Sequence, residues 1–235
     1  MSMRRTLNRR NQQGLSLIEL MISMVLGLIV VSGLFNMYLG SNRSSQFSNG
    51  LQQMQENGRY GMSTLQKGFR LAGYSAEELV EPFDIAASND STVVVRMRLA
   101  YDCNGGSTAA SNGIAVNTYT LDTTPVDPLK SQLVCTGNSA GATAMPLVEG
   151  VEEFRVLYGI STDDDAIPER YIPYEAGINA REVVSLRFAL LVNSGNPIRT
   201  RDVTESYTVL DKEVSRTDSV ARSVFTSTVK LRNRR

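Results

Sequence analysis

One apolar run near the amino terminus constrains this chain more than any other feature. Residues 15–39 read LSLIELMISMVLGLIVVSGLFNMYL, and Glu19 is the only charged side chain among them. As an α-helix that rises 1.5 Å per residue, residues 15–35 alone would span about 31 Å, which is enough to cross the hydrocarbon core of a bilayer. The sequence therefore predicts one helix of membrane-spanning length, with a carboxylate near its start.

Residues 1–14 form a basic leader in front of this run. They contain no acidic residue and four arginines, Arg4, Arg5, Arg9 and Arg10. By the positive-inside rule, such a charge bias holds the amino end in the cytoplasm and places the rest of the chain across the membrane.

The composition excludes the most familiar catalytic centres. The chain has 235 residues with 24 basic and 24 acidic side chains, so loss of the four leader arginines would leave it mildly acidic. It has no histidine, which removes imidazole catalysis, Ser-His-Asp and Cys-His pairs and His-ligated metals. We therefore expect no enzyme, no cofactor and no metal site.

Three explanations of the apolar run compete. A secretory signal peptide has similar basic and apolar regions, but no A-x-A cleavage site follows the run. A plain single-pass anchor explains the length. Neither explains Glu19, because a carboxylate inside a bilayer costs about 3 kcal/mol. The third explanation gives that carboxylate a function.

The string Gly14-Leu15-Ser16-Leu17-Ile18-Glu19-Leu20, behind a short basic leader, resembles the type IV prepilin signal, or class III leader. The resemblance implies that a prepilin peptidase cuts after Gly14 and methylates the new amino terminus at Leu15, where family members usually carry Phe. It also implies that Glu19, the fifth residue of the mature chain, pairs with the terminal amine of a neighbouring subunit and sets the register of assembly.

The helical pattern continues beyond the apolar run. Apolar or small residues recur at steps of three and four from Leu51 to Ala72, which is one stripe of an amphipathic helix that we expect to pack on the protein's own domain. Several glycines here lower helix propensity by about 1 kcal/mol each, and the polar stretch 40–45 is also a weak helix former. Gly73 is a candidate C-cap. Residues 40–73 are thus expected to continue the helix of residues 15–39.

From residue 74 onward the periodicity becomes that of strands. Alternating apolar residues, separated by segments rich in Gly, Asn, Ser and Pro, predict a series of strands. These cover residues 93–101, 114–121, 131–135, 151–158, 184–192, 203–210 and 223–231. The sequence therefore predicts an α+β fold, with one β-rich domain at residues 74–235 on a long amino-terminal helix.

Cys103 and Cys135 each lie at the end of a predicted strand, beside turn residues. In an exported protein we expect them to form one disulfide, which would contribute roughly 3–4 kcal/mol in the chain-entropy model. Two free thiols are the alternative.

Three strings imitate functional motifs. Residues 137–141 match the G-x-S-x-G nucleophile elbow, but the motif's later histidine is missing, so we interpret them as a loop. Asp163-Asp164-Asp165 lacks the alternating ligands of an EF-hand and is interpreted as a solvated turn. Residues 230–235 carry four positive charges, which we interpret as a solvated strand end or a contact with an acidic subunit rather than a DNA site.

Several strings in the body of the chain resemble the PilW family of minor pilins. They are LQQMQENGRY at 51–60, FRLAGY at 69–74, VEGVEEF at 148–154, LYG at 157–159 and FTSTVKLRNR at 225–234. The resemblance implies a pilin-like fold in a low-abundance subunit. Such a subunit is anchored by one span in the bacterial inner membrane, with its globular domain in the periplasm, and later joins the pilus at the cell surface.

The same resemblance implies a function without catalysis. A PilW-type minor pilin would help prime pilus assembly, sit at the pilus tip and support piliation and twitching motility. Its partners would be other minor pilins, a pilus-tip adhesin, the major pilin, the prepilin peptidase and the inner-membrane assembly platform, but not nucleic acid. A minor pseudopilin of a type II secretion system, or a membrane-anchored binding domain that never polymerises, remains an alternative.

Overall fold

The computed structural model describes residues 16–163, 165–175 and 177–234. Its contacts divide the chain into two units, which meet between Ser45 and Gln46. The long helix α1 (Leu17–Leu71) belongs to both, and each unit is described on its own.

In the first unit, α1 is helical from Leu17 onward, and its side chains are exposed almost throughout. The polar stretch at residues 40–45 does not interrupt the helix. A hydroxyl there bonds back to the helix, because Ser45 Oγ donates to the Ser41 carbonyl at 3.0 Å. The weak propensity predicted for this stretch is therefore not enough to break α1.

The second unit holds two antiparallel sheets of four strands and a two-stranded hairpin. The first sheet has the order β1 (Thr92–Arg98), β2 (Ile114–Asp122), β3 (Gln132–Thr136) and β4 (Met145–Glu149). The second has the order β10 (Arg222–Lys230), β7 (Val183–Asn193), β5 (Val151–Ile160) and β6 (Arg170–Ile172). The hairpin pairs β8 (Val203–Val209) with β9 (Lys212–Asp218). Short 3-10 helices lie at Ile85–Ala87, Ala109–Ser111, Pro128–Lys130 and Ala180–Glu182.

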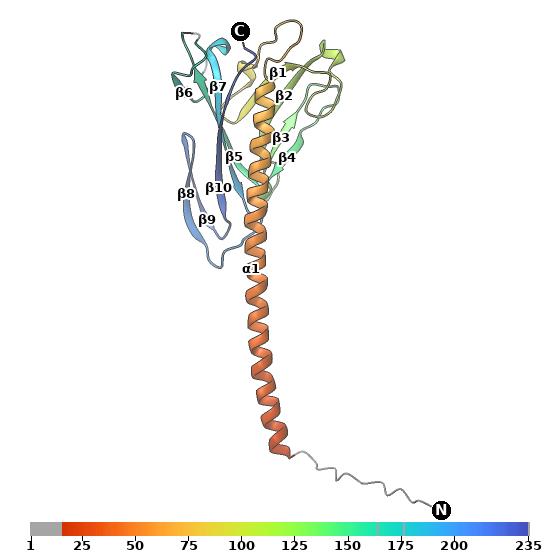
Figure 1. Ribbon diagram of the computed structural model, residues 1–235, viewed down its shortest axis with the longest axis vertical. Helices are drawn as coiled ribbons and strands as arrows, with labels where there is room; N and C mark the ends of the chain where they lie inside the picture. Colours follow the sequence, from red (N-terminus) through yellow and green to blue (C-terminus); the bar gives the residue numbers. More distant parts are fainter. Residues whose placement is uncertain (1–15, 164, 176, 235) are drawn as a thin grey trace, which may run out of the picture. The chain divides into compact units, whose positions relative to one another are not determined.

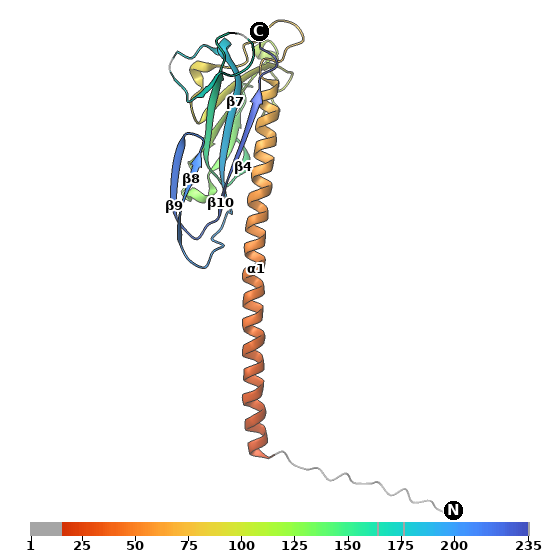
Figure 2. The ribbon, with the colours of Figure 1, turned by 60° about the vertical axis from the view of Figure 1, so that its left-hand side comes forward.

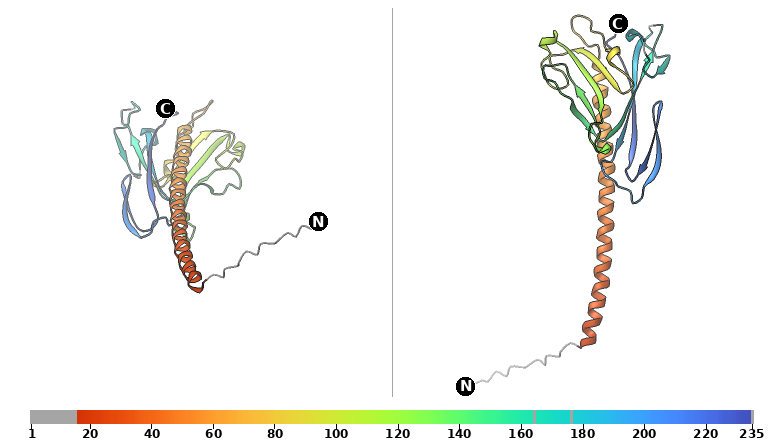
Figure 3. Two further views of the ribbon diagram at one scale, coloured as in Figure 1. Left: turned by 60° about the horizontal axis from the view of Figure 1, so that its bottom comes forward. Right: turned by 180° about the vertical axis from the view of Figure 1, so that it is seen from behind.

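The carboxyl half of α1 runs along the two sheets, with β10 on one side and β4 on the other (Figure 1). Seen from behind, the sheets diverge to either side of the helix (Figure 3). The ring of Phe69 in α1 is fully buried and contacts both sheets. It makes edge contacts with Tyr119 of β2, at 5.6 Å between ring centroids, and with Phe188 of β7, at 5.1 Å. One core therefore lies under the helix and between the sheets.

The helix ends where the sequence predicts. Gly73 has a left-handed φ of +76°, which a residue with a Cβ adopts at a cost, and its N–H donates to the Arg96 carbonyl at 2.8 Å. The chain then runs beside β1, since the Arg98 N–H donates to the Tyr74 carbonyl at 2.7 Å.

The β8–β9 hairpin lies on the outer side of the second sheet (Figure 2). It covers a small apolar cluster in which Ala189 and Leu191 of β7 meet Val209 and Val214 of the hairpin, all buried. The hairpin thus hides sheet surface that would otherwise be exposed apolar area.

The observed strands differ from the sequence prediction at a few points. β1 ends at Arg98 rather than at residue 101, and Tyr101 instead forms an isolated bridge with Ser107. β4, β6 and β9 are not among the predicted strands, because they are short or largely polar and show little alternation. The α+β architecture itself agrees with the prediction.

Candidate assembly helix and its docking domain

Glu19 lies in the first turn of α1 and is exposed. Its backbone carbonyl accepts a hydrogen bond from Ser23 Oγ at 2.7 Å. Its carboxylate has no bonding partner within the described part of the chain. A carboxylate at the amino end of a helix lies where the positive pole of the helix dipole favours it.

The apolar residues around Glu19 have no core to pack against within the described part of the chain. An 18-residue stretch of α1 in this part is strongly apolar, and none of it is buried. By length and composition this part of α1 can cross a membrane. Leu17, Leu28 and Met37 are among its most exposed side chains, with at least 70% of their surface accessible.

Gly14 and Leu15, the predicted cleavage and methylation positions, lie outside the described residues. Leader cleavage after Gly14 and N-methylation of Leu15 therefore remain predictions.

The carboxyl half of α1 is built to lie close to the β-domain. Met54, Leu65 and Phe69 of the predicted apolar stripe are buried. Gly58, which the sequence places in this stripe, lies on the same contact face, as do the three other buried glycines of the helix, Gly50, Gly61 and Gly68. A Cβ at Gly58 would come within 2.3 Å of the Phe225 ring. Close approach to the sheets explains why glycines are accepted at these positions.

Polar side chains fix the helix along its length. Gln66 Nε2 donates to Ser227 Oγ of β10 at 2.6 Å, and Asn57 Nδ2 donates to the Glu149 carbonyl of β4 at 3.1 Å. Asn233 Nδ2 donates to the carbonyls of Arg70 and Ala72, at 3.1 and 3.3 Å. Since the last carbonyls of a helix have no intrahelical partner, Asn233 satisfies groups that would otherwise remain unpaired.

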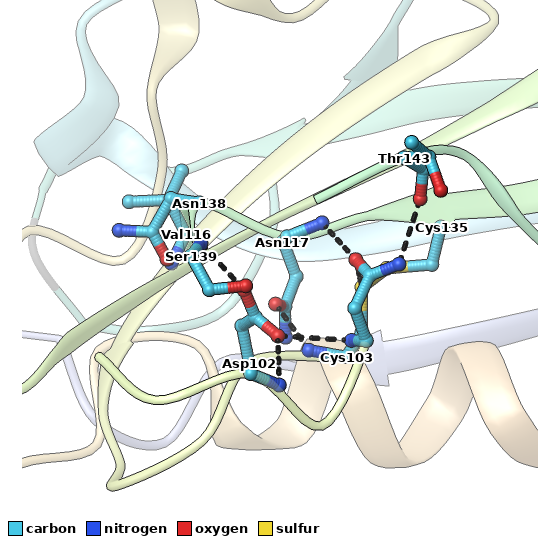
Figure 4. Close-up of a disulfide and its surroundings, with 11 residues drawn as sticks. Asp102, Cys103, Val116, Asn117, Cys135, Asn138, Ser139 and Thr143 are labelled. Carbon is cyan, nitrogen blue, oxygen red and sulfur yellow. Dashed lines mark hydrogen bonds between the residues drawn. A yellow bond between two sulfur atoms is a disulfide. The ribbon is translucent and has the colours of Figure 1, made fainter. Parts of the chain in front are cut away.

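The structure joins Cys103 and Cys135 in a disulfide, as the sequence analysis expected (Figure 4). The bond connects the turn after β1 to the end of β3, with the two Cα atoms 6.4 Å apart. Cys103 N–H also donates to Asn117 Oδ1 of β2 at 2.9 Å, so the cross-link lies on the face of the first sheet.

The buried carboxylate of Asp102 organises the loops beside this disulfide (Figure 4). It accepts backbone N–H bonds from Asn104 and Gly106 at 3.0 Å and from Ser139 at 2.8 Å. Burial raises the pKa of the Asp102 carboxyl, but the bonds from Ser139, Gly106 and Asn104 outweigh it, and the pKa lies below its ordinary value.

The G-x-S-x-G string at residues 137–141 belongs to this loop structure. Asn138 accepts from the Val116 N–H and donates to the Ile114 carbonyl, both at 3.0 Å, so the string is attached to the edge of β2. A Cβ at Gly137 would lie 2.1 Å from an Asp102 oxygen. The glycine and serine are therefore explained by loop packing.

The acidic turn bonds to its own neighbours. Asp163 and Asp165 accept from Ser161 Oγ at 3.1 and 3.3 Å, and Asp164 lies outside the described residues. Among the residues that the structure describes, no three Cys, Asp or Glu side chains group together as metal ligands.

A buried ion network, which the sequence analysis missed, connects the second sheet to the hairpin. Glu152 of β5 and Arg222 of β10 pair at 2.8 Å, with only 4% and 3% of their side chains exposed. Arg222 also binds Asp218 of β9 through two bonds of 2.7 and 2.6 Å. Glu152 further accepts from Arg216 Nε at 3.1 Å and from Asn193 Nδ2 at 3.0 Å. No local pattern reveals such a network, because its members lie in four separate segments.

The family model described as Type IV Pilus-assembly protein W matches residues 115–233, and that of the prokaryotic N-terminal methylation motif matches residues 9–35. The chain belongs to the PilW family. No curated protein matches this PilW-family chain. Among solved structures it is similar to a type IV-like pilin from Thermus thermophilus, with 14% identity over 78% of this chain and 96% of that one, and a TM-score of 0.42.

Family membership confirms the resemblance on which the sequence analysis relied. A PilW-family pilin with a methylation motif is anchored in the inner membrane by its apolar amino-terminal helix, carries its globular domain outside the cytoplasm and later enters the pilus. The family is structural rather than enzymatic.

Proposed function

We propose that this PilW-family chain is a minor pilin that helps prime type IV pilus assembly in the inner membrane and is incorporated at the pilus tip. In that position it supports piliation and twitching motility. The observation that carries the proposal is Glu19, the one charge on the exposed apolar part of α1.

Cleavage gives this carboxylate its partner. A cut after Gly14 creates a cationic amine on Leu15, which the peptidase then methylates. In an apolar surrounding, Glu19 of one subunit pairs with the terminal amine of the next and sets their axial register. Removing one member of a buried pair leaves the other uncompensated, at a cost of about 3–5 kcal/mol.

Each of the four parts of the chain then has its own function. Residues 1–14 are the cleaved leader, residues 15–39 the transmembrane and filament-core helix, residues 40–73 its amphipathic continuation, and residues 74–235 the β-domain. That domain presents surfaces to other minor pilins, to the tip adhesin and to the major pilin. The prepilin peptidase and the assembly platform act on the amino-terminal part.

The first test is the amino terminus of the protein in cells with and without prepilin peptidase. Intact mass should correspond to a chain that starts at N-methyl-Leu15, and to the uncleaved chain when the peptidase is absent. A start at Met1 in both strains, or a cut after the apolar run, would refute the pilin function.

The second test is Glu19→Ala, with Glu56→Ala as the matched control in the carboxyl half of the same helix. Glu19→Ala should be cleaved normally but should not enter pili, whereas Glu56→Ala should do both. Normal incorporation of Glu19→Ala would refute the role of Glu19 in register.

Deletion of the gene tests the placement in the pilus machine. Surface pili and twitching should decrease while the major pilin is still processed. Unchanged piliation, together with co-purification of secretion pseudopilins, would assign the protein to a type II secretion system instead.

A further inference from the structure

A groove of about 420 Å³ lies between the carboxyl half of α1 and the loops at one end of the β-domain. Its volume falls within the range of ligand sites, about 300–1,000 Å³. It is lined mainly by amides and loop backbone, from Gln53, Asn57, Pro125, Leu129, Lys130, Gln132, Glu149, Gly150, Asn193, Gly195 and Asn196.

The floor of this amide groove is held by Asn193, which is 1% exposed. Its Nδ2 donates to the Leu129 carbonyl at 3.1 Å and to Glu152 at 3.0 Å, and its Oδ1 accepts from the Gly195 N–H at 2.7 Å. Its own N–H donates to the Gly150 carbonyl at 2.8 Å. Through its side chain and its backbone, this one buried residue ties three loops to the ion network, so the groove is formed before any ligand arrives.

The walls of the groove carry exposed amides that make no hydrogen bond to the described part of the protein itself. The side-chain amides of Gln53 and Asn196 have no hydrogen-bond partner within the part of the chain that the structure describes. The Gln53 amide faces the opposite loop, since a Cβ at Gly195 would lie 3.7 Å from both its nitrogen and its oxygen. Asn57 uses one amide proton for the Glu149 carbonyl, which leaves its second proton and its oxygen available.

The chemistry of these walls indicates one class of ligand. We propose that the amide groove binds an extended peptide segment of another protein, and that Gln53, Asn57 and Asn196 read its backbone. An amide side chain offers a donor and an acceptor together, which is the complement of a peptide unit. Gln53 and Asn57 are four residues apart on one helix face, about 5–6 Å between Cβ atoms. Every second residue of an extended chain recurs at about 6.6 Å, so both amides can meet the same edge of one peptide.

Other ligand classes fit the groove less well. None of its lining residues is aromatic, so it offers no platform for stacked bases. It contains one lysine and one glutamate and no arginine, so it lacks the guanidinium fork that phosphates favour. The inference goes beyond the proposed function, because it holds wherever the subunit sits in the machine.

The test uses the full-length protein in detergent micelles and a random library of 12-residue peptides. Affinities of selected peptides are measured by fluorescence anisotropy. Gln53→Ala and Asn196→Ala should each weaken binding at least fivefold. Gln52→Ala is the matched control, because Gln52 is the neighbouring glutamine, bonds to Glu56 and does not line the groove. It should bind as the unchanged protein does.

A second experiment tests whether the groove recognises the backbone of the peptide rather than its side chains. N-methylation of alternate amides in a selected peptide should reduce binding at least tenfold in one of the two alternation registers, whereas changing its side chains to alanine should have a smaller effect. The inference is overturned if the library yields no peptide that depends on Gln53 and Asn196, or if side-chain changes outweigh N-methylation. Melting curves of each variant, read by circular dichroism, must match the unchanged protein, which exposed positions such as Gln53 and Asn196 should allow.

Discussion

Gly68 of α1 lies directly against the Tyr119 side chain of β2, and a Cβ at position 68 would be 2.3 Å from the phenolic oxygen. Real Cβ atoms do not come this close to other heavy atoms, so the side chain at position 68 must be a hydrogen. Tyr119 is 4% exposed and packs against Phe69, so it has little room to move. The glycine therefore sets the distance between the helix and the first sheet.

Gly68→Ala should destabilise the β-domain although alanine is the better helix former. Overpacking a closed core costs about 1–3 kcal/mol, and the gain in helix propensity returns about 1 kcal/mol. We expect a net loss of up to about 2 kcal/mol in the free energy of unfolding, measured by chemical denaturation of the purified protein.

Gly40→Ala is the matched control, because a Cβ at that helical glycine meets nothing within 4 Å. It should be neutral or slightly stabilising. Tyr119→Phe removes the atom nearest to the new methyl group, so it should recover part of the loss when combined with Gly68→Ala. A Gly68→Ala protein as stable as Gly40→Ala would contradict the steric account.

Much of the fold can be predicted from periodicity. The amphipathic stripe from Leu51 to Ala72 reflects burial of one helix face. The alternation at Val184–Val192 reflects side chains that point in turn to opposite faces of a strand. β7 in fact has both of its faces largely buried, since the hairpin covers the outer side. The unbroken apolar run at residues 188–192 is consistent with a strand that is buried on both faces, but it does not show that the hairpin, which lies elsewhere in the sequence, supplies the cover.

The function of a glycine is harder to predict. Propensity alone marks Gly58 and Gly68 as defects in a helix, and only the packed structure shows that Phe225 and Tyr119 lie against them. Similarly, Glu152 lies in the acidic-looking string VEGVEEF, where it resembles any surface carboxylate. Its burial depends on Arg222, which is distant in sequence.

For the candidate assembly site, the sequence is more informative than the structure. Glu19 is conspicuous in the sequence, since a single charge in an apolar run needs an explanation. The structure adds only that it lies in the first helical turn and is exposed. The amide groove, by contrast, is invisible in the sequence, because Gln53, Asn193 and Asn196 acquire their meaning only when three loops meet α1.

The buried ion pair gives a second prediction. Arg222→Met should lower the free energy of unfolding by up to about 3–5 kcal/mol, because the buried Glu152 would keep only the more exposed Arg216 and the Asn193 amide as partners. Lys212→Met is the control, since Lys212 is about half exposed in its pair with Glu153 and such pairs contribute about 1 kcal/mol or less. Similar losses for the two variants, measured by thermal unfolding, would show that the network does not stabilise the hairpin.

The disulfide gives a third prediction. Replacing Cys103 and Cys135 together by serine should cost roughly 3–4 kcal/mol in the chain-entropy account, because the unfolded chain gains freedom. Adding a reductant to the unchanged protein should lower its melting temperature as much as the double serine replacement does. The mass of the reduced protein should increase by two hydrogens. A reductant that lowers the stability of the double serine variant as well would point to an effect other than the disulfide.

The fourth prediction concerns acid. The bond from Arg222 holds the pKa of the Asp218 carboxyl below its ordinary value, against the opposing effect of burial, and the loops beside the disulfide do the same for Asp102. Near pH 4 the unfolded chain therefore binds more protons than the folded one, so stability rises with pH. The contribution is complete above the ordinary carboxyl pKa of about 3.9 and is lost as the pH falls through the lower folded values.

Stability should therefore change little between pH 7 and about 5 and should fall steeply below about 4. Asp218→Asn should be less stable than the unchanged protein at pH 7, and the difference should shrink at low pH, where the carboxyl of the unchanged protein is protonated as well. Asp202→Asn is the control, because Asp202 is exposed and its carboxylate has no partner within the described residues, so its acid profile should match that of the unchanged protein. Melting temperatures measured at each pH decide the matter. A constant difference between Asp218→Asn and the unchanged protein down to pH 3 would show that the Arg222–Asp218 bond does not depend on the charge of Asp218.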